Sequence, residues 1–195
     1  MKGGKFVAGV SKIKKEDIIN MAYEIVRENG ESALSARELA KKLNCSIQPI
    51  FYNFSNMDDL KEEVYQKIND VYKSYMFKEN SQESYKDTGI GYIKFARDYP
   101  EFFKIMFMKE TNRNTKDFID VDHVGDEIIK IGQKFTGLSK EKQKDFHLKV
   151  WIFTHGLATL VVTKTIKFTD AEIEDLITNT VRQMIKGYKM EEGEN

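Results

Sequence analysis

Cysteine and proline are scarce in this sequence of 195 residues, which contains one cysteine and two prolines. The single cysteine, Cys45, excludes an intramolecular disulfide and fits a reducing cytoplasm, where we expect the protein to act. Because the prolines are confined to Pro49 and Pro100, little interrupts helix along most of the chain. No apolar run approaches the roughly 18 residues of a membrane span, and the N-terminus lacks a signal-peptide core, so we expect no membrane partner.

The sequence also lacks an excess of charge of either sign, since 31 Lys+Arg residues face 31 Asp+Glu residues. This balance excludes a polycation that coats nucleic acid nonspecifically, but it is compatible with a localised DNA-binding face. There is no glycine-rich phosphate-binding loop and no nucleophile motif, and the three histidines have no spacing relation to Cys45. We therefore expect neither an enzyme nor a cofactor.

A predicted helix-turn-helix opens at Ser35. This serine and Glu38 have the spacing of a capping box, in which each side chain bonds the other residue's backbone N–H. Asn44 breaks the first helix, because asparagine tolerates the left-handed conformation. Ser46 is expected to cap the second helix, with Pro49 in its first turn, where a missing N–H costs little. In a helix-turn-helix, the second helix enters the major groove of DNA.

The helix-turn-helix belongs to a predicted three-helix domain at residues 14–60. Its first helix runs to Asn29, and Gly30 is the stop signal. Residues 1–13 are rich in glycine and lysine and form a predicted arm, which either reaches DNA phosphates or is disordered with no role.

The second helix of the motif is expected to turn Ile50, Phe51 and Phe54 toward the core. Asn56, with Asp59 at the third helical position, then begins a longer helix. Cys45 lies where the motif needs a small buried group, so it is either a packing residue or a redox sensor.

A larger helical domain is predicted over residues 61–190, followed by an acidic tail at 191–195. One of its helices ends at Tyr99-Pro100, because the residue before a proline is pushed out of helical geometry. Residues 102–108 follow almost without polar side chains, and a helix that is apolar on nearly all sides must be buried on nearly all sides. This segment either lines a cavity or fills the core.

Three more helices are predicted after it. Residues 118–135 and 139–168 have helical patterns. Within the latter, residues 161–166 have strand-like propensity, but no second strand exists to pair with them. Thr169 forms a capping box with the glutamate three residues later and begins the last helix, which Gly187 and the acidic tail are expected to end.

The helix-turn-helix region resembles the DNA-binding domain of TetR-type (tetracycline-repressor-like) transcriptional regulators. The residues that carry the resemblance are 35–40 (SARELA), 43–46 (LNCS), 50–54 (IFYNF) and 58–60 (DDL). The sequence departs from the family's pattern in four places, one of which is a pair of residues. Asn44 replaces a glycine, Phe51 replaces a tyrosine that contacts phosphate, and Met57 replaces a phosphate-binding lysine. Gln48-Pro49 replaces a pair of small residues.

Two further segments resemble the ligand-binding domain of one subgroup of this family. Residues 151–158 (WIFTHGLA) resemble its "WHG" signature, and residues 99–107 (YPEFFKIMF) resemble a second typical segment. The resemblance implies that the last two helices pair with those of a second subunit in a four-helix bundle.

Together, the residues and the resemblance predict an all-α homodimer. It has an N-terminal helix-turn-helix domain and a larger helical domain for ligand binding and dimerisation. The implied function is a transcriptional regulator, a repressor of a pseudo-palindromic double-stranded operator, which a small apolar or aromatic effector releases. The alternative is a ligand-binding or scaffolding protein of the same fold that has lost operator binding.

The predicted sites fall into three groups. The DNA-binding residues are Ser35, Arg37, Ser46, Ile47, Gln48, Pro49, Phe51, Tyr52 and Asn53. The ligand-binding residues are Tyr92, Phe95, Phe103, Met106, Phe107, Phe118, Trp151 and His155. The dimer interface contains Phe153, Leu157, Leu160, Ile173, Ile177, Val181 and Met184, because the burial of its last four residues was expected to exceed what one subunit supplies.

Two of these assignments have a plainer alternative. His155 either touches the ligand or is a hydrogen-bonded core histidine. Asp122, His123, Asp126 and Glu127 either converge on a metal or form a solvated charged face, and we predict the latter and no metal site.

Overall fold

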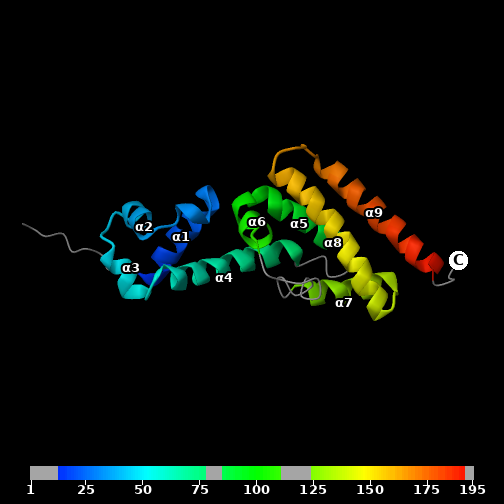
Figure 1. Ribbon diagram of the computed structural model, residues 1–195, viewed down its shortest axis with the longest axis horizontal. Coiled ribbons are helices and arrows are strands. Elements are labelled where there is room, and N and C mark those ends of the chain that lie inside the picture. The colour runs from blue at the N-terminus through cyan, green and yellow to red at the C-terminus, as the bar shows by residue number, and fades with distance from the viewer. Residues whose placement is uncertain (1–12, 78–84, 111–123, 192–195) are drawn as a thin grey trace, which may run out of the picture. The chain divides into compact units, whose positions relative to one another are not determined.

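The computed structural model describes residues 13–77, 85–110 and 124–191, and every regular element in these ranges is helical (Figure 1). The α-helices are α1 (Lys15–Asn29), α2 (Ala36–Lys42), α3 (Gln48–Asn53), α4 (Met57–Met76), α5 (Tyr85–Asp98), α6 (Pro100–Phe107), α7 (Gly125–Thr136), α8 (Lys140–Val162) and α9 (Asp170–Glu191). The all-α prediction is confirmed. The chain divides into two compact units, residues 1–67 and 68–195, and the boundary lies within α4.

The first unit packs α1, α2, α3 and the start of α4 around one apolar core. Its most buried large side chains, each at most 2% exposed, are Ile18, Ile25, Leu39, Ile50 and Leu60. They come from all four helices, so burial of this core holds the short helices α2 and α3 in place, which are too short to be stable alone.

The local signals of the helix-turn-helix are confirmed in part. One half of the predicted capping box forms, whereas no hydrogen bond from the Ser35 backbone N–H to the Glu38 carboxylate is found among the described residues. The Ser35 hydroxyl accepts a hydrogen bond from the backbone N–H of Glu38 at 3.2 Å, and Asn44 has the left-handed backbone with φ 51°. The prediction that Ser46 caps α3 is wrong. Ile47 is the residue that precedes the helix, and no side chain caps it. Pro49 in the first turn removes one of the N–H groups that a cap would satisfy.

The start of α4 is as the sequence predicts. The Asn56 side-chain oxygen accepts hydrogen bonds from the backbone N–H groups of Asp58 and Asp59, at 2.8 and 2.9 Å. Further along, buried residues recur every fourth position through both units. They are Leu60, Val64, Ile68, Tyr72 and Met76.

Helix α5 lies at the centre of the second unit. It packs against α6, α7, α8 and α9, and half of its 14 residues are buried. Figure 1 shows α8 and α9 as two long helices joined by a short connection, with the shorter α5, α6 and α7 beside them. A helix buried on so many sides needs small residues where other backbones approach. Gly91 of α5 meets this need, since a Cβ atom there would overlap the backbone carbonyl oxygen of Tyr75 in α4.

The predicted bounds of the last helices need correction. Helix α8 ends at Val162, before the residue that was expected, because Lys164 takes a left-handed backbone with φ 57°. Residues 163–166 are therefore not helical, although they form no strand either. Helix α9 runs through Gly187 to Glu191 rather than ending at the glycine. The capping box at its start is confirmed, with Thr169 N–H 2.8 Å from a carboxylate oxygen of Glu172.

The apolar segment at residues 102–108 is only partly buried. Phe102 and Phe103 are fully enclosed, Phe107 is half-buried, and Met108 is 45% exposed. The expectation of burial on nearly all sides is thus wrong, because α6 packs on α5 with one face only. Residues 118–123 of the next predicted helix lie outside the described residues, and α7 begins at Gly125.

The close approach of α5 to α4 leads to a stability prediction. We expect Gly91→Ala to lower the free energy of unfolding by about 1–3 kcal/mol, because the new methyl group meets backbone that cannot rotate away. Gly187→Ala in α9 is the matched control. Its Cβ meets no atom within 4 Å, so it should raise the stability by about 0.5–1 kcal/mol. Urea unfolding measures both, and a neutral Gly91→Ala would contradict the packing described here.

Candidate functional site

Helix α3 presents an exposed and uncharged surface in the first unit. Tyr52 is 82% exposed, and Ile47 and Phe51 are each 46% exposed. The prediction that Phe51 points inward is therefore wrong, whereas Ile50 and Phe54 are buried as expected. Helix α3 and the residue before it thus expose three large apolar or aromatic side chains.

The polar residues predicted to contact DNA differ in their availability. Gln48 is exposed and its amide forms no hydrogen bond within the described residues. Asn53 is half-buried, and its amide nitrogen donates to the Pro49 carbonyl oxygen at 2.7 Å. The Ser35 hydroxyl caps α2. Of the two amides, Gln48 is thus the one with both donor and acceptor free.

Helix α2, which precedes α3 in the chain, carries exposed basic side chains. Arg37, Lys41 and Lys42 are all exposed, and the nearest carboxylate to the Lys41 ammonium is Glu38 at 3.8 Å. Ser46 is also exposed, while Pro49 is half-buried. The exposed positive charge of the two helices therefore belongs to α2, because α3 contains no charged residue.

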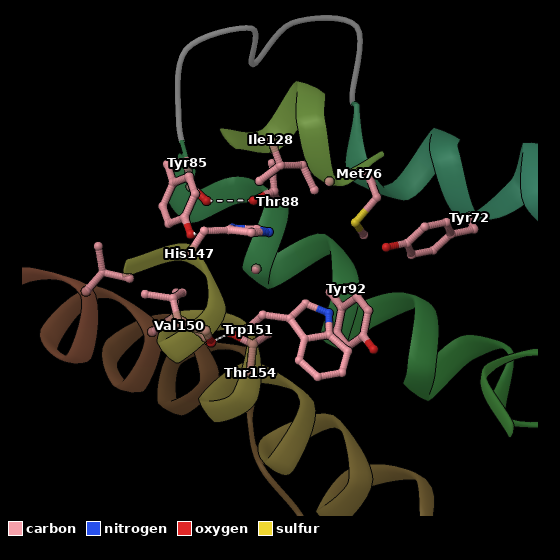
Figure 2. A pocket seen from close by; sticks show the side chains of 14 residues that line it. Tyr72, Met76, Tyr85, Thr88, Tyr92, Ile128, His147, Val150, Trp151 and Thr154 are labelled. Carbon is pink, nitrogen blue, oxygen red and sulfur yellow. Dashed lines mark hydrogen bonds between the residues drawn. The ribbon is translucent and has the colours of Figure 1, made fainter. Parts of the chain in front are cut away.

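A cavity of about 50 Å³ lies in the second unit (Figure 2). It is enclosed by parts of α4, α5, α7, α8 and α9. The aromatic and histidine side chains that line it are Tyr72, Tyr85, Tyr92, His147 and Trp151. None of the lining side chains carries a formal charge at neutral pH, so the cavity is mainly apolar with a few polar groups, which is typical of small-molecule sites.

The structure places only part of the predicted ligand-binding set at this cavity. Tyr92 and Trp151 line it. Phe103, Phe107 and His155 instead form an aromatic cluster behind Tyr92, with ring centroids 5.1–6.3 Å from the Tyr92 ring.

The remaining members of the set are distributed elsewhere. Phe95 is fully buried beside Tyr72, Met106 is half-buried on α6, and Phe118 lies outside the described residues. The sequence analysis missed Tyr85 and His147. His147 lies one turn before Trp151 and two turns before His155 on α8, and this spacing is the signal that would have placed it on the same face.

Two tyrosine–histidine hydrogen bonds join α5 to α8. The Tyr85 hydroxyl is 2.8 Å from Nδ1 of His147, and the Tyr92 hydroxyl is 3.0 Å from Nδ1 of His155. His155 also stacks on Trp151, with 4.6 Å between the ring centroids. His155 thus has the hydrogen bond of a core histidine and touches the cavity only through its neighbours.

Burial keeps the inner pair uncharged. Burial lowers the pKa of His147 to about 4 and raises the pKa of Tyr85 above its ordinary value. Burial also lowers the pKa of His155, which is less enclosed. All three groups are therefore neutral at physiological pH.

Four residues of the predicted dimer interface are buried inside the subunit and do not lie on the outer surface of α8 and α9. Leu157, Ile173, Ile177 and Val181 are at most 6% exposed within a single chain. The premise that one subunit cannot bury Ile173, Ile177 and Val181 is therefore wrong, because α5 and the cavity wall cover them.

Other apolar residues of the two helices remain accessible. Ile152 is 57% exposed and Leu176 is 38% exposed, while Phe153, Leu160 and Met184 are half-buried. A monomer thus exposes apolar side chains on the outer face of both helices.

The described residues contain neither a metal-binding cluster nor a helix that could cross a membrane. Within the described ranges, no group of three or more His, Cys, Asp and Glu side chains lies close enough to hold a metal. Asp122 and His123 of the acidic cluster lie outside these ranges, and Asp126 and Glu127 are exposed in the first turn of α7. No described helix is both long enough and apolar enough to cross a membrane.

The neutral state of His147 leads to a pH prediction. As the pH falls from about 6.5 to about 4, the unfolded chain takes up a proton at this imidazole that the folded chain does not. The stability should therefore be complete above about pH 6.5 and should fall by about 3 kcal/mol by about pH 4 from this group alone. His147→Asn should remove that component, so urea unfolding across this range should show a shallower acid loss than in wild type. Equal losses in both proteins would contradict the buried neutral state.

Comparisons with known proteins identify the fold. No protein-family model and no curated protein matches the sequence. Among crystal structures, a TetR variant from Acinetobacter baumannii AYE in complex with minocycline matches with a TM-score of 0.53 and 15% identity, covering 91% of this chain and 97% of that one. A protein of unknown function from Rhodococcus sp. RHA1 matches with a TM-score of 0.63 and 15% identity, covering 95% of this chain and 98% of that one. A transcriptional regulator from the same organism matches with a TM-score of 0.59 and 11% identity, covering 91% of this chain and 97% of that one. This chain therefore has the all-α fold of the TetR-type transcriptional regulators.

Proposed function

We propose that this protein is a homodimeric transcriptional regulator, acting as a repressor, that binds operator DNA through α3 and releases it when a small molecule enters the cavity. The observation that carries the proposal is the exposed α3 surface of the helix-turn-helix, whose first helix is capped by Ser35. The second unit of the same chain contains an uncharged cavity. The role involves no catalysis, and such a regulator acts in the cytoplasm, where its DNA lies.

Gln48 supports sequence-specific contact with base edges. A glutamine amide bonds both N6 and N7 of adenine, and this amide is unoccupied on the exposed side of α3. Phe51 and Ile47 add apolar surface of the kind that contacts the thymine methyl group. The Asn53 amide nitrogen donates to the Pro49 carbonyl oxygen, so Asn53 is not part of the proposed base-reading surface. We expect half-sites rich in A·T pairs.

Few groups are available to bind phosphate. Arg37 and the lysines of α2 supply positive charge, and Tyr52 and Ser46 supply exposed hydroxyls. Helix α3 has no charged residue, and Met57 begins α4 where the resembling family has a lysine. We therefore expect binding to weaken only gradually with salt, because each missing phosphate contact reduces the logarithmic slope by about 0.9.

The exposed apolar face of α8 and α9 supports dimerisation. Ile152 and Leu176 would be covered by the same helices of a second copy, in a four-helix bundle. Gly156 lies on this face, and no atom lies within 4 Å of the position of its missing Cβ, so a partner backbone can approach closely there. Two recognition helices related by a two-fold axis would bind successive major grooves about 34–36 Å apart.

Release by an effector is a population shift between two states of the dimer. A ligand changes DNA affinity only by binding more tightly to the state whose recognition helices no longer match the grooves. The cavity is smaller than the roughly 300 Å³ of common ligand sites, so the effector is small or the cavity widens when it binds. The TetR variant bound to minocycline is an example of a protein of this fold with a ligand.

The uncharged α3 surface also favours a second candidate. A protein of this fold that has lost operator binding would use the same apolar residues to bind another protein. Electrophoretic mobility shift against the DNA that flanks its own gene, over a range of salt concentrations, separates the two. Retarded bands that persist over excess nonspecific DNA support the regulator, and their absence at all salt concentrations supports the alternative.

The proposed division between base-reading and phosphate-binding residues is testable by two substitutions. Gln48→Ala should relax base preference at one position in each half-site, at a cost of about 1–3 kcal/mol there. Met57→Lys should instead tighten binding to all sequences alike and steepen the salt slope by about 0.9. Competition against a panel of single-base variants measures both. If Met57→Lys changes the preferred sequence and Gln48→Ala does not, the division is wrong.

The dimer surface is testable by a charge placed on it. Leu176→Glu should raise the dimer dissociation constant at least about tenfold, because a carboxylate would be buried without a partner. Phe135→Glu is the matched control, since Phe135 is an exposed aromatic on α7, away from the proposed interface. Sedimentation velocity at micromolar concentration distinguishes them. A wild-type protein that is monomeric in this range would refute the dimer.

A further inference from the structure

The cavity contains a buried histidine that is hydrogen-bonded to a tyrosine. The position of the proton on the imidazole ring decides which groups of a ligand the histidine can bind. His147 reaches into the cavity from α8, and Tyr85 reaches it from the start of α5 (Figure 2). Both residues are at most 8% exposed, and the hydroxyl lies 2.8 Å from Nδ1 of the imidazole. This hydrogen bond fixes which ring nitrogen remains for a ligand.

The phenol is the donor of this bond. Both groups are neutral, and a phenol O–H is a stronger donor than an imidazole N–H, while an imidazole nitrogen is a stronger acceptor than a phenol oxygen. Nδ1 of His147 therefore accepts, and the proton of the neutral ring lies on Nε2. No residue in the described part of the chain accepts a hydrogen bond from Nε2.

The two threonine hydroxyls that line the cavity are not available as donors to a ligand. The Thr88 hydroxyl donates to the Tyr85 carbonyl oxygen at 2.7 Å, and the Thr154 hydroxyl donates to the Val150 carbonyl oxygen at 2.8 Å. Their oxygens retain only acceptor capacity. The Nε2–H group of His147 is therefore matched by an acceptor on the ligand.

The charge state of the ligand follows from its surroundings. The lining contains no Lys, Arg, Asp or Glu, so a bound carboxylate or ammonium would lose its hydration without gaining a counter-ion. Tyr72, Tyr92 and Trp151 instead offer aromatic surface to an apolar body.

We infer that the cavity binds an uncharged, mainly apolar molecule that carries a carbonyl-type oxygen, which accepts a hydrogen bond from Nε2–H of His147. The inference rests on the proposed function in treating the cavity as the effector site. It adds the chemical class of the effector, and it names Tyr85 as the residue that determines specificity by fixing the imidazole tautomer.

The test uses four probes built on one six-membered ring, with the full-length protein, and cyclohexanol is the fourth of them. Cyclohexanone carries the acceptor, methylenecyclohexane replaces its oxygen by CH₂, and cyclohexanecarboxylate carries a charge. Trp151 is the only tryptophan and lines the cavity, so its single indole N–H signal in ¹H–¹⁵N NMR spectra reports binding without DNA. The affinity ratio of cyclohexanone to methylenecyclohexane, compared between variants, isolates the hydrogen bond from the general hydrophobic term.

In wild type at neutral pH, the ketone should bind and the carboxylate should not. His147→Phe should lower the ketone-to-alkene ratio about tenfold, as expected for the loss of one buried hydrogen bond. Tyr85→Phe should also lower this ratio, and it should raise the relative affinity of cyclohexanol, because the freed imidazole can then present an acceptor. His155→Phe removes a histidine that does not line the cavity and should leave the ratio unchanged.

Three results would overturn the inference: an unchanged ratio in both His147→Phe and Tyr85→Phe, tighter binding of the carboxylate than of the ketone, or no binding by any probe up to its solubility. If His147→Phe does not fold, Tyr85→Phe alone decides. These outcomes are separate from the mobility-shift result, since a protein that binds the ketone as expected but does not bind DNA would refute the proposed function and retain the ligand class.

Discussion

The packing of α5 against α8 is the constraint on which the rest of the second unit depends. Helix α5 is buried on many sides, and it carries two tyrosines whose hydroxyl groups would be costly to bury without partners. Tyr85 and Tyr92 lie seven residues apart, about two turns, and His147 and His155 lie eight apart on α8. Both hydrogen bonds form only in one alignment of the two helices, so they fix how far one helix slides along the other.

This alignment accounts for the position of the cavity. Tyr85 and His147 are at one end of it, and Tyr92 and Trp151 lie along its aromatic side (Figure 2). Ile177 and Val181 of α9 form another wall of the cavity. The apolar stripe of α9 therefore faces the interior of the subunit. In the proposed dimer, the second subunit would therefore cover the exposed residues Leu176 and Ile152 instead.

The sequence predicted the first unit more accurately than the second because its signals are local. Ser35, Asn44 and Asn56 act through hydrogen bonds or backbone angles within a few residues, so their effects can be inferred without knowing the fold. The apolar stripe of α9 was recognised, but periodicity does not say whether the same chain or a second copy covers it.

The cavity was harder to predict because it depends on contacts between residues that are distant in the sequence. Its walls come from segments more than 100 residues apart, such as Tyr72 and Val181, and only the packed helices bring them together. The segment at residues 102–108 was expected to line it because of its composition, whereas α6 packs beside it. Helix ends that depend on one backbone angle, as at Lys164, also escaped prediction, because lysine rarely adopts positive φ.

The central claim, that this fold serves sequence-specific DNA binding by a dimer, is tested most directly by selection from a random double-stranded DNA library with the full-length protein. The account predicts enrichment of a pseudo-palindrome with A·T-rich half-sites whose centres are about 10 base pairs, or a multiple of one helical turn, apart. Failure to enrich any sequence over several rounds, or enrichment of a motif without two-fold symmetry, would contradict it.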